Sequence, residues 1–371
     1  MRKYSIAAIP GDGIGPEVVA EGIKVLDAAA GMAGISFEYS VFPWGCGYWL
    51  EHGVAMPEDG LDILSKFDAI YLGAAGLPGE VPEEVGVRGL VLTIRSGFEQ
   101  FANIRPVRPI PGCPWYLKHR EPEEIDFVVV REATEGFYCN LGGRFKPGSE
   151  EFADIMDMQP AFGRSSEIAL QTGVFSEQGC RRVIRFAFEL ARQRDGKRRV
   201  ARATKTNALC HAMTLWDEVF DEVAAEYPDC ETEWYHVDAL SMRFITTPEW
   251  FDVVVAPNLF GDILTDLSAT LTGGLGFAPG GNLSETGPSM FEPPHGSAPD
   301  IMGKGVANPV AAILTAALMA EHLGEAEVAA LIRSGVEDVV KTGQTLTPDA
   351  GGSATTEEVG TAIVNAVERQ S

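Results

Sequence analysis

The stretch AAIPGDGIGPEVVAEG, residues 7–22, places three glycines between a short apolar run and a helical pattern. An ordinary dinucleotide-binding turn follows G-x-G-x-x-G, in which the third glycine lets the helix pack closely on the strand. Here the glycines are Gly11, Gly13 and Gly15, so the third comes one residue early, and Pro16 takes a first-turn helix position where its missing N–H costs nothing. The stretch therefore predicts a strand-to-helix turn that is not an ordinary Rossmann phosphate site.

Two acids near this turn support the same interpretation. Asp12 would place a carboxylate against any pyrophosphate bound there, and two like charges repel each other. Glu38 lies roughly where the ribose-binding acid of a Rossmann unit is expected, but we interpret this match as a coincidence and not as a ribose site. If a cofactor binds, we expect its phosphates and ribose to be held elsewhere in the chain.

Composition limits the class of protein. With 371 residues, the chain is long enough for two domains or one large α/β unit. A formal net charge of −24 argues against a nucleic-acid-binding or anionic-membrane surface. If the substrate is an acid, local arginines must therefore overcome an unfavourable overall field.

The cysteines and the apolar runs predict a cytoplasmic protein. The six cysteines show no C-x-x-C spacing, which favours a reducing compartment with isolated thiols. The apolar run near the first residue breaks at Pro10 and Gly11, too early for a signal peptide. The run AAILTAALMA at 311–320 is too short to span a bilayer and predicts a buried helix.

Short apolar runs alternate with helical patterns along the chain. YSIAAI, FDAIYLGA, EIDFVVVRE and FDVVVAPN predict strands, whereas QGCRRVIRFAFELARQR predicts an amphipathic helix. A helix is also expected from about Pro57 and another over 89–104. This alternation predicts an α/β fold with a largely parallel sheet. The Pro-rich segment 105–124 and the Gly-rich segment 273–288 are expected to cross between domains. The segment 141–171 has weak periodicity and receives no assignment.

Four arginines are candidates for binding an anion. Arg95 and Arg105 are expected on and just after one helix, Arg88 lies in the segment before it, and Arg131 ends the apolar strand DFVVVR. A buried arginine needs a partner, because an unpaired buried charge is very costly. Arg131 therefore either forms an internal salt bridge, with Glu132 or another acid, or clamps a substrate carboxylate in bidentate fashion.

Two aspartates are candidate metal ligands. Asp262 and Asp266 are spaced i, i+4 after a buried strand and share one helix face. Two such carboxylates repel each other unless a cation joins them, and oxygen ligands suit Mg²⁺ or Mn²⁺. The alternative is a first helical turn that favours acids through its dipole. Asp238, which ends EWYHVD, is a third candidate.

Further groups with possible roles in chemistry follow two other strands. ATKTNA places Lys205 and Asn207 just after a strand, where a lysine near a metal and arginines would act as a base; the alternative is a solvated loop lysine. Tyr138 lies seven residues past Arg131 and is either a general acid or a packed aromatic ring.

The stretch EPPHGSAPDIMGKGVANP, residues 292–309, is a candidate nucleotide-binding loop. His295, Gly296 and Ser297 would form a backbone-rich loop for phosphate or adenine. Asp300 would accept hydrogen bonds from ribose hydroxyls. The alternative is a Gly/Pro-rich surface loop.

Together these segments resemble the isopropylmalate/isocitrate dehydrogenase family of metal-dependent decarboxylating β-hydroxyacid dehydrogenases, over nearly the whole chain. The resemblance rests, in this order, on GDGIGPE (11–17), IRSGFEQFANIRP (94–106), VVREATEG (129–136), KTNA (205–208), NLFGDILTD (258–266) and HGSAPDIMGKGVANP (295–309). Three further segments look most like the tartrate/D-malate dehydrogenase branch: FPWGCGYWLEHG (42–53), RFAFELA (185–191) and TPEWFDVVV (247–255).

The resemblance implies a two-domain α/β fold that is not an ordinary Rossmann fold. One domain would contain residues 1–108 and 276–371 and bind the cofactor, and 109–275 would form a smaller domain with the dimer interface and a clasping arm. The 11–17 loop would border the nicotinamide of NAD. The adenosine half would be held by His295, Gly296, Ser297, Ala298, Asp300, Ile301 and Asn308. Asp300 favours NAD, since relatives that use NADP carry lysine there.

The resemblance also implies a role for each remaining candidate. Substrate would be bound by Arg88, Arg95, Arg105, Arg131 and Asn207, and Mg²⁺ or Mn²⁺ by Asp262, Asp266 and the Asp238 of a second subunit. Lys205 would come across the dimer interface as the base, and Tyr138 would protonate the enol carbon after loss of CO₂. The protein would therefore be a homodimer with shared active sites acting on a small hydroxy acid. A K⁺ requirement and the preferred divalent ion are left open.

Departures from the branch leave the substrate open. Arg131-Glu132-Ala133 stands where the branch has REN, and residues 86–89, with Arg88, stand where it has SLWG. The segment 150–172 is also longer than expected. The overall likeness favours D-malate or tartrate, whereas Arg88 favours isocitrate, homoisocitrate or another malate with an anionic C3 group. A non-catalytic regulatory subunit is the alternative of another class.

Overall fold

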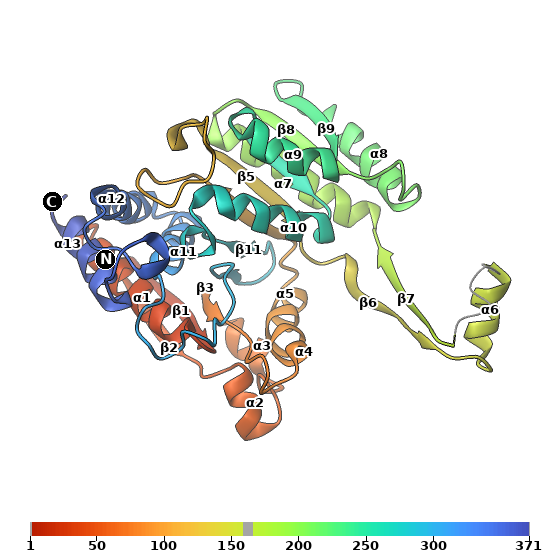
Figure 1. The fold of residues 1–371 in the computed structure, drawn as a ribbon, viewed down its shortest axis with the longest axis horizontal. Helices are drawn as coiled ribbons and strands as arrows, with labels where there is room; N and C mark the ends of the chain where they lie inside the picture. Colours follow the sequence, from red (N-terminus) through yellow and green to blue (C-terminus); the bar gives the residue numbers. More distant parts are fainter. Residues whose placement is uncertain (1, 159–165, 371) are drawn as a thin grey trace.

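The computed structural model describes residues 2–158 and 166–370, and Figure 1 gives their arrangement. The described chain contains a ten-stranded sheet in the order β2-β1-β3-β12-β11-β4-β5-β10-β8-β9. Its strands are β1 (Arg2–Gly11), β2 (Ile35–Val41), β3 (Ala69–Ala74), β4 (Ala102–Val107), β5 (Phe127–Glu132), β8 (Arg199–Thr204), β9 (Glu231–His236), β10 (Val253–Ala256), β11 (Gly281–Leu283) and β12 (Ser289–Phe291).

The sheet is parallel at both ends and antiparallel in the middle. Strands β2, β1, β3 and β12 pair in parallel, as do β5, β10, β8 and β9. Between these blocks, β11 runs antiparallel to both β12 and β4, and β4 runs antiparallel to β5. The expected α/β fold with a largely parallel sheet is therefore correct, and the antiparallel centre joins two βα blocks.

Helices cover both faces of the sheet, which explains why its strands are apolar on both sides. One face carries α1 (Gly15–Met32), α7 (Glu177–Arg194), α8 (Ala212–Ala224), α11 (Val310–His322), α12 (Ala326–Thr342) and α13 (Thr356–Glu368) around one large apolar core. The other face carries α2 (Cys46–His52), α3 (Gly60–Leu64), α4 (Glu83–Gly86), α5 (Leu92–Gly97), α9 (Val237–Thr246) and α10 (Asn258–Ala269). Strand β5 alternates accordingly, with Val128 and Val130 in the first core and Phe127 and Val129 in the second.

Short helical turns complete the backbone. A π-helix spans Val87–Val91 between α4 and α5. Turns of 3₁₀ helix span Pro122–Glu124, Pro248–Trp250, Thr270–Thr272, Leu275–Phe277 and Pro348–Ala350.

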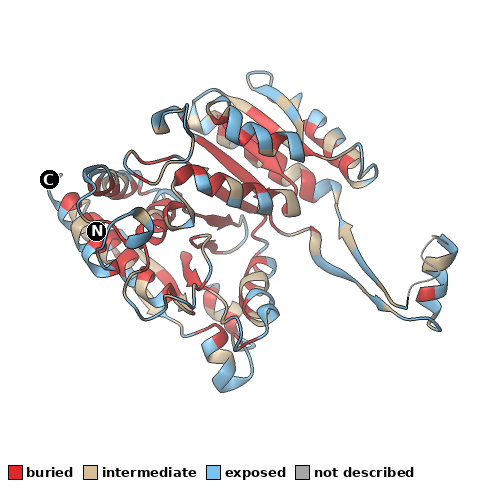
Figure 2. Ribbon diagram, viewed as in Figure 1, coloured by how far each residue is buried: buried red, intermediate tan, exposed pale blue. Residues whose placement is uncertain are grey.

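An arm projects from the body and is mostly exposed (Figure 2). It consists of β6 (Gly136–Phe145) and β7 (Ile168–Val174), which pair antiparallel, and α6 (Glu150–Met158). This arm accounts for much of the segment 141–171 that the sequence left unassigned; residues 159–165 lie outside the described part.

One expectation about local structure is wrong in part. The helix expected over 89–104 ends with α5 at Gly97, and Ala102 already begins β4, so Arg105 lies within a strand. Apolar residues there fit either a helix or a buried strand, and the tight turn at Glu99, with φ +46°, separates the two. The helix expected from about Pro57 is present as the short α3, Gly60–Leu64. The Gly-rich segment 273–288 contains β11 at the antiparallel centre.

The 11–17 turn packs against protein rather than forming an open cradle. The Asp12 carboxylate accepts backbone N–H bonds from Cys46, Gly47 and Gly76 at 2.8–2.9 Å. Gly13 has φ +62°, and a Cβ there would lie 2.0 Å from the carbonyl oxygen of Ser297. The N-terminal glycine turn therefore serves close contact with the 292–309 loop. Glu38 forms an exposed ion pair with Lys3 at 2.7 Å.

Across the described residues, none of the helices is both long and apolar enough to cross a membrane.

Candidate active site

Arg95 and Glu292 form a buried ion pair below the central hollow of the molecule. Arg95 lies on α5 and Glu292 directly follows β12, and their Nη2 and Oε1 atoms are 2.5 Å apart. Burial alone would raise the pKa of Glu292, but the positive charges of Arg95 and Arg105 and a hydrogen bond from Asn282 hold it below its ordinary value. Glu292 is therefore a buried carboxylate that remains charged.

A chain of amides joins this pair to a second arginine. Arg105 Nε donates to Asn103 Oδ1 at 2.8 Å, Asn103 donates to Asn282 Oδ1 at 2.8 Å, and Asn282 donates to Glu292 at 2.9 Å. Burial, with the nearby charge of Arg95, lowers the pKa of Arg105 to about 10. Two arginines are thus held side by side on a shared, fully buried network.

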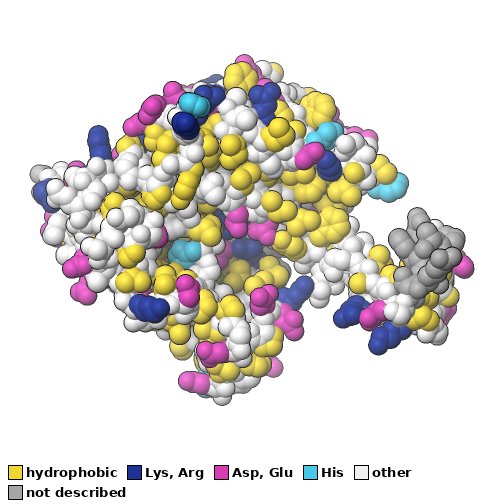
Figure 3. Space-filling model, in the orientation of Figure 1, with side chains coloured by type: hydrophobic (Ala, Val, Ile, Leu, Met, Phe, Trp, Pro, Cys, Tyr) yellow, Lys and Arg dark blue, Asp and Glu magenta, His cyan; other side chains and the backbone are white. Residues whose placement is uncertain are grey.

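Both arginines keep a hydrogen-bond donor unused. Within the described residues, Arg95 Nε and Arg105 Nη1 are buried and have no hydrogen-bond partner. Leaving buried charged donors unpaired is costly, so each of these two N–H groups would be stabilised by a hydrogen bond to an anion. Figure 3 shows side chains of both charges gathered in a hollow at the middle of the molecule, below α10.

Arg131 forms an internal salt bridge, but not with its neighbour. Its Nη1 pairs with Asp262 on α10, and its Nε donates to Asn258 Oδ1 at 3.0 Å. Glu132 instead accepts the N–H groups of Thr134 and Glu135, at 2.8 and 2.9 Å, so the internal salt bridge of Arg131 forms with another acid, Asp262, and not with Glu132. Side chains of successive strand residues point to opposite faces, which separates Arg131 from Glu132.

Tyr138 joins the same cluster from the arm. Its hydroxyl donates to Asp262 Oδ2 at 2.5 Å, and the Arg131 guanidinium lies 5.4 Å from its ring centre. Burial, with the hydrogen bond to Asp262, raises the pKa of Tyr138 to about 12. The phenol is therefore protonated at neutral pH and is placed as a proton donor rather than as a core aromatic.

Asp262 and Asp266 present two carboxylates from successive turns of α10. Burial raises the pKa of Asp266, with a further contribution from the charge of Asp262, while Arg105 and Arg131 oppose the shift. Two hard oxygen donors on one helix face fit Mg²⁺ or Mn²⁺. Among the described residues, no group of three or more His, Cys, Asp or Glu side chains could hold a metal ion.

Lys205 and Asp238 meet at the other end of the sheet. Lys205 follows β8, Asp238 lies in the first turn of α9, and Nζ is 2.7 Å from Oδ1. Asp238 is 69% exposed, and its hydrogen bond from Lys205 holds its pKa below the ordinary value. Asn207 is exposed in the turn that follows. Within the described chain, Lys205 and Asp238 thus contact each other and do not form a cluster with Asp262 and Asp266.

The 292–309 loop lies against the glycine turn and borders a cavity. Ile14 N donates to Ser297 O at 2.9 Å. Ile14, His295, Ile301 and Asn308 line a cavity of about 240 Å³ with Val306 and Asp349. Burial lowers the pKa of His295, and its buried Nε2 has no hydrogen-bond partner in the described chain. An apolar cavity with one unsatisfied ring nitrogen fits a heteroaromatic base.

The remaining loop residues frame this cavity. Ala298 adopts φ +42°, a strained conformation, and Gly296 and Asp300 are exposed. Asn308 donates to Asp349 Oδ2 at 3.0 Å and accepts from Val310 N at 3.1 Å, so its side chain is fixed before any ligand arrives.

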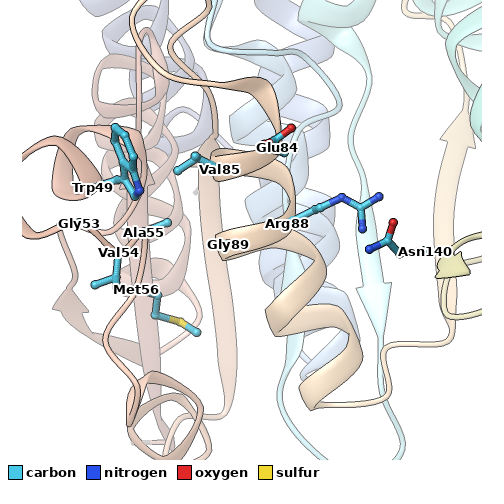
Figure 4. A pocket seen from close by; sticks show the side chains of 10 residues that line it. All are labelled: Trp49, Gly53, Val54, Ala55, Met56, Glu84, Val85, Arg88, Gly89 and Asn140. Carbon is cyan, nitrogen blue, oxygen red and sulfur yellow. The ribbon is translucent and has the colours of Figure 1, made fainter. Parts of the chain in front are cut away.

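Arg88 lies apart from the arginine network, at a second cavity. Trp49, Val54, Met56 and Glu84 line this cavity of about 590 Å³ together with Arg88 and Asn140. Figure 4 shows the Arg88 guanidinium extending from its helix toward Asn140 of the arm. Arg88 is exposed, and its guanidinium forms no ion pair with another described residue.

Sequence reasoning missed four residues of the site: Asn103, Asn258, Asn282 and Glu292. Glu292 stood in the quoted 292–309 stretch, and Asn258 begins NLFGD. The only available signal was that several buried arginines need counter-charges. Their partners come from strands and helices distant in sequence.

Comparison with known proteins places this geometry in a family. The model of the isocitrate/isopropylmalate dehydrogenase family matches residues 5–363, and the chain belongs to that family. The probable tartrate dehydrogenase/decarboxylase of Bacillus subtilis is 49% identical over 362 residues, which are 97% of this chain and 96% of that protein. The D-malate dehydrogenase (decarboxylating) of Escherichia coli is 45% identical over 377 residues, 100% of each chain.

A solved structure agrees with the sequence relatives. The crystal structure of isocitrate dehydrogenase from Methylococcus capsulatus superposes with a TM-score of 0.85 at 34% identity and covers 99% of both chains. The predicted family, its tartrate/D-malate branch and the predicted fold class are therefore confirmed. The chain is a decarboxylating dehydrogenase of this family, as its motifs predict.

Proposed function

We propose that this enzyme catalyses the NAD-dependent and divalent-metal-dependent oxidative decarboxylation of a malate-type 2-hydroxy acid, D-malate or tartrate. One observation carries the proposal: two buried arginines keep unused donors beside a second cluster in which Arg131, Tyr138 and the Asp262/Asp266 pair meet. The names of the Bacillus subtilis and Escherichia coli relatives support this substrate class.

Each residue then has a physical task. Arg95, Arg105 and Arg131 bind and orient the substrate carboxylates. Asp262 and Asp266 would hold Mg²⁺ or Mn²⁺, and the ion would supply stabilisation of negative charge on the C2 oxygen. Lys205 would take the proton of the C2 hydroxyl, and bound NAD⁺ would supply the acceptor for the C2 hydride.

The second half of the reaction uses Tyr138. The 2-keto acid loses its β-carboxylate as CO₂, and the electron pair of that C–C bond forms an enolate. Tyr138 then donates its hydroxyl proton to C3, for which its raised pKa keeps the phenol protonated. Proton transfer of this kind contributes roughly 10²–10⁴-fold to the rate.

The 292–309 loop supports NAD as the cofactor. His295 and the apolar wall at Ile14 and Ile301 would hold the adenine ring, with Asn308 beside it. The exposed Asp300 would accept hydrogen bonds from the ribose hydroxyls and repel a 2′-phosphate. Gly296, Ser297 and Ala298 would shape the loop.

The proposal includes a homodimer with shared sites, because two aspartates of one chain are few ligands for a divalent ion. Lys205 and the third ligand, Asp238, would come from the second chain. Exposed apolar side chains near these residues fit an interface: Trp234 (58% exposed), Met242 (68%) and Ile263 (58%). The domain division at 1–108 plus 276–371 and at 109–275, with 136–174 as a clasping arm, belongs to this proposal, as does a cytoplasmic location.

A second substrate candidate rests on Arg88. Its guanidinium borders a cavity of about 590 Å³ opposite Asn140, which suits an anionic C3 substituent such as that of isocitrate or homoisocitrate. A tricarboxylate substrate would therefore use Arg88 for specificity.

The test measures NADH formation by the purified protein with NAD⁺ and Mn²⁺. D-malate, tartrate, 3-isopropylmalate, isocitrate and homoisocitrate are compared, with CO₂ release measured in parallel. Fast turnover of D-malate or tartrate, unchanged in Arg88→Ala, supports the first substrate class. Turnover only of tricarboxylates, lost in Arg88→Ala, supports the second. No turnover of any acid, with or without added K⁺, contradicts the catalytic proposal and favours a regulatory subunit.

A further inference from the structure

The two threonines that flank Lys205 are tied to one carboxylate on the neighbouring helix. Thr204 Oγ1 donates to Asp217 Oδ2 at 3.0 Å, and Thr206 Oγ1 donates to the same oxygen. The two hydroxyl oxygens are also 2.8 Å from each other. Asp217 lies on α8, whose inner side packs into the large apolar core through Trp216. The backbone on both sides of Lys205 is therefore fixed by a rigid helix.

The backbone of Lys205 has a second restraint. Its carbonyl oxygen accepts from Ala208 N at 3.0 Å and from Leu209 N at 2.9 Å, which closes the turn after β8. Within the described residues, the Lys205 ammonium pairs with one side chain, the exposed carboxylate of Asp238. A lysine has a long and flexible stem, so the position of its Cα largely sets which atoms its amine reaches.

A second aspartate on α8, Asp221, distinguishes support of Arg202 from contact with the threonines. Arg202 on β8 pairs with both Asp217, at 3.2 Å, and Asp221 one turn later. The Asp217 side chain is 18% exposed and contacts the threonines, whereas the Asp221 side chain is 67% exposed and pairs with Arg202. Both acids support Arg202, but only Asp217 reaches the segment that carries Lys205.

We propose that Asp217 is a positioning residue for the active-site base, acting through Thr204 and Thr206 to place Lys205. The inference rests on the proposed role of Lys205 and goes beyond it by assigning a function to a residue on α8. Substrate binding by the arginines uses α5, β4 and β5, so a displaced Lys205 lowers the rate of proton transfer and leaves substrate affinity unchanged.

The experiment compares steady-state kinetics of the full dimeric enzyme with Asp217→Ala, Asp217→Asn and the matched control Asp221→Ala. A misplacement of about 1 Å at a reacting group costs on the order of 10²-fold. Asp217→Ala should lower kcat by roughly 10–100-fold with KM within about twofold of the parent. Asp217→Asn keeps one oxygen that accepts from both threonines and should retain most of kcat. Asp221→Ala should match the parent enzyme.

A second pair of variants keeps the test decisive if Asp217→Ala folds poorly. Thr206→Val removes one hydroxyl at nearly constant volume and should lower kcat with KM unchanged, whereas Thr206→Ser keeps the hydroxyl and should restore kcat. The pH profile of kcat supplies an independent readout, because a displaced base shifts its acidic limb while a purely structural defect does not.

The outcomes separate this inference from the proposed function. If Lys205→Met is inactive while Asp217→Ala and Thr206→Val are fully active, the positioning role of Asp217 is overturned. The assignment of Lys205 as the base is then unaffected. Lys205→Met with full activity overturns the base assignment itself. Equal losses in Asp217→Ala and Asp221→Ala would assign the effect to Arg202 and also overturn the positioning role.

Discussion

The two halves of the candidate site are built differently. On the side of β4, β5 and β12, Arg95, Arg105 and Glu292 are buried and joined by a continuous hydrogen-bond network. On the side of β8 and β9, Lys205 and Asp238 form one ion pair, 27% and 69% exposed. The first half is organised within one chain, whereas the second half is open to solvent in this chain.

This contrast indicates that a single chain can fix the positions of its buried charged side chains, but not of those exposed to water. A buried charge must be paired by its own fold, because no water replaces a missing partner. An exposed lysine and aspartate can remain solvated until a second subunit removes the water. The following predictions test that contrast, from the largest expected effect to the smallest.

The first prediction tests whether the two halves belong to different chains. Lys205→Met and Arg131→Ala should each be nearly inactive as homodimers. Mixing them after dissociation should restore activity, because a heterodimer combines the intact arginine side of one chain with the intact lysine of the other. With random pairing, one site in about four is intact, so activity should approach a quarter of the parent value.

The readout is NADH formation before and after joint refolding, and refolding each variant alone is the control. A mixture that remains as inactive as its components would place Lys205 and Arg131 in one chain's site and contradict the shared arrangement.

The second prediction compares stability on the two sides. Arg95→Gln removes the ion-pair partner of the buried Glu292 carboxylate and should lower the free energy of unfolding by about 3–5 kcal/mol. Asp238→Asn removes an exposed pair and should leave urea unfolding of the isolated subunit unchanged. Equal decreases in the free energy of unfolding of the two variants would mean that the buried and the exposed ion pair contribute equally to stability.

The third prediction concerns the divalent ion. An ion that binds only the folded protein at about 100 times its Kd adds about 2.7 kcal/mol, so Mn²⁺ should raise the melting temperature of the parent enzyme. Asp266→Asn should reduce that rise strongly, whereas Asp300→Asn, in the proposed nucleotide loop, should keep it. Thermal melting with and without Mn²⁺ is the measurement, and an undiminished response of Asp266→Asn would remove this residue from the metal site.

The fourth prediction is a pH dependence from Glu292. Its folded-state pKa lies below the ordinary value, so this carboxylate stabilises the fold above its unfolded pKa. That stabilisation is lost as the pH falls through the lower, folded-state pKa. The free energy of unfolding, measured from neutral to acidic pH, should therefore fall more steeply in the parent than in Glu292→Gln. The glutamine of this variant has no carboxylate to protonate. Parallel curves would contradict the charged state of Glu292.

Several features could be predicted from local patterns. Apolar runs such as the one in β5 and the early third glycine of the 11–17 turn depend on residues adjacent in sequence, and both were interpreted correctly. The spacing of Asp262 and Asp266 likewise placed both carboxylates on one helix, α10. The end of the helix at Gly97 was missed, because an apolar run alone does not separate a helix from the following buried strand.

The partners of the arginines depend on long-range packing. Arg131 pairs with an acid 131 positions away rather than with its neighbour Glu132, since strand geometry sends adjacent side chains to opposite faces. Glu292 meets Arg95 across 197 positions only because β12 and β11 return to the sheet between β3 and β4. Residue types and short spacings thus define the available chemistry, whereas the pairing of buried charges is set by which distant strands and helices the folded sheet brings together.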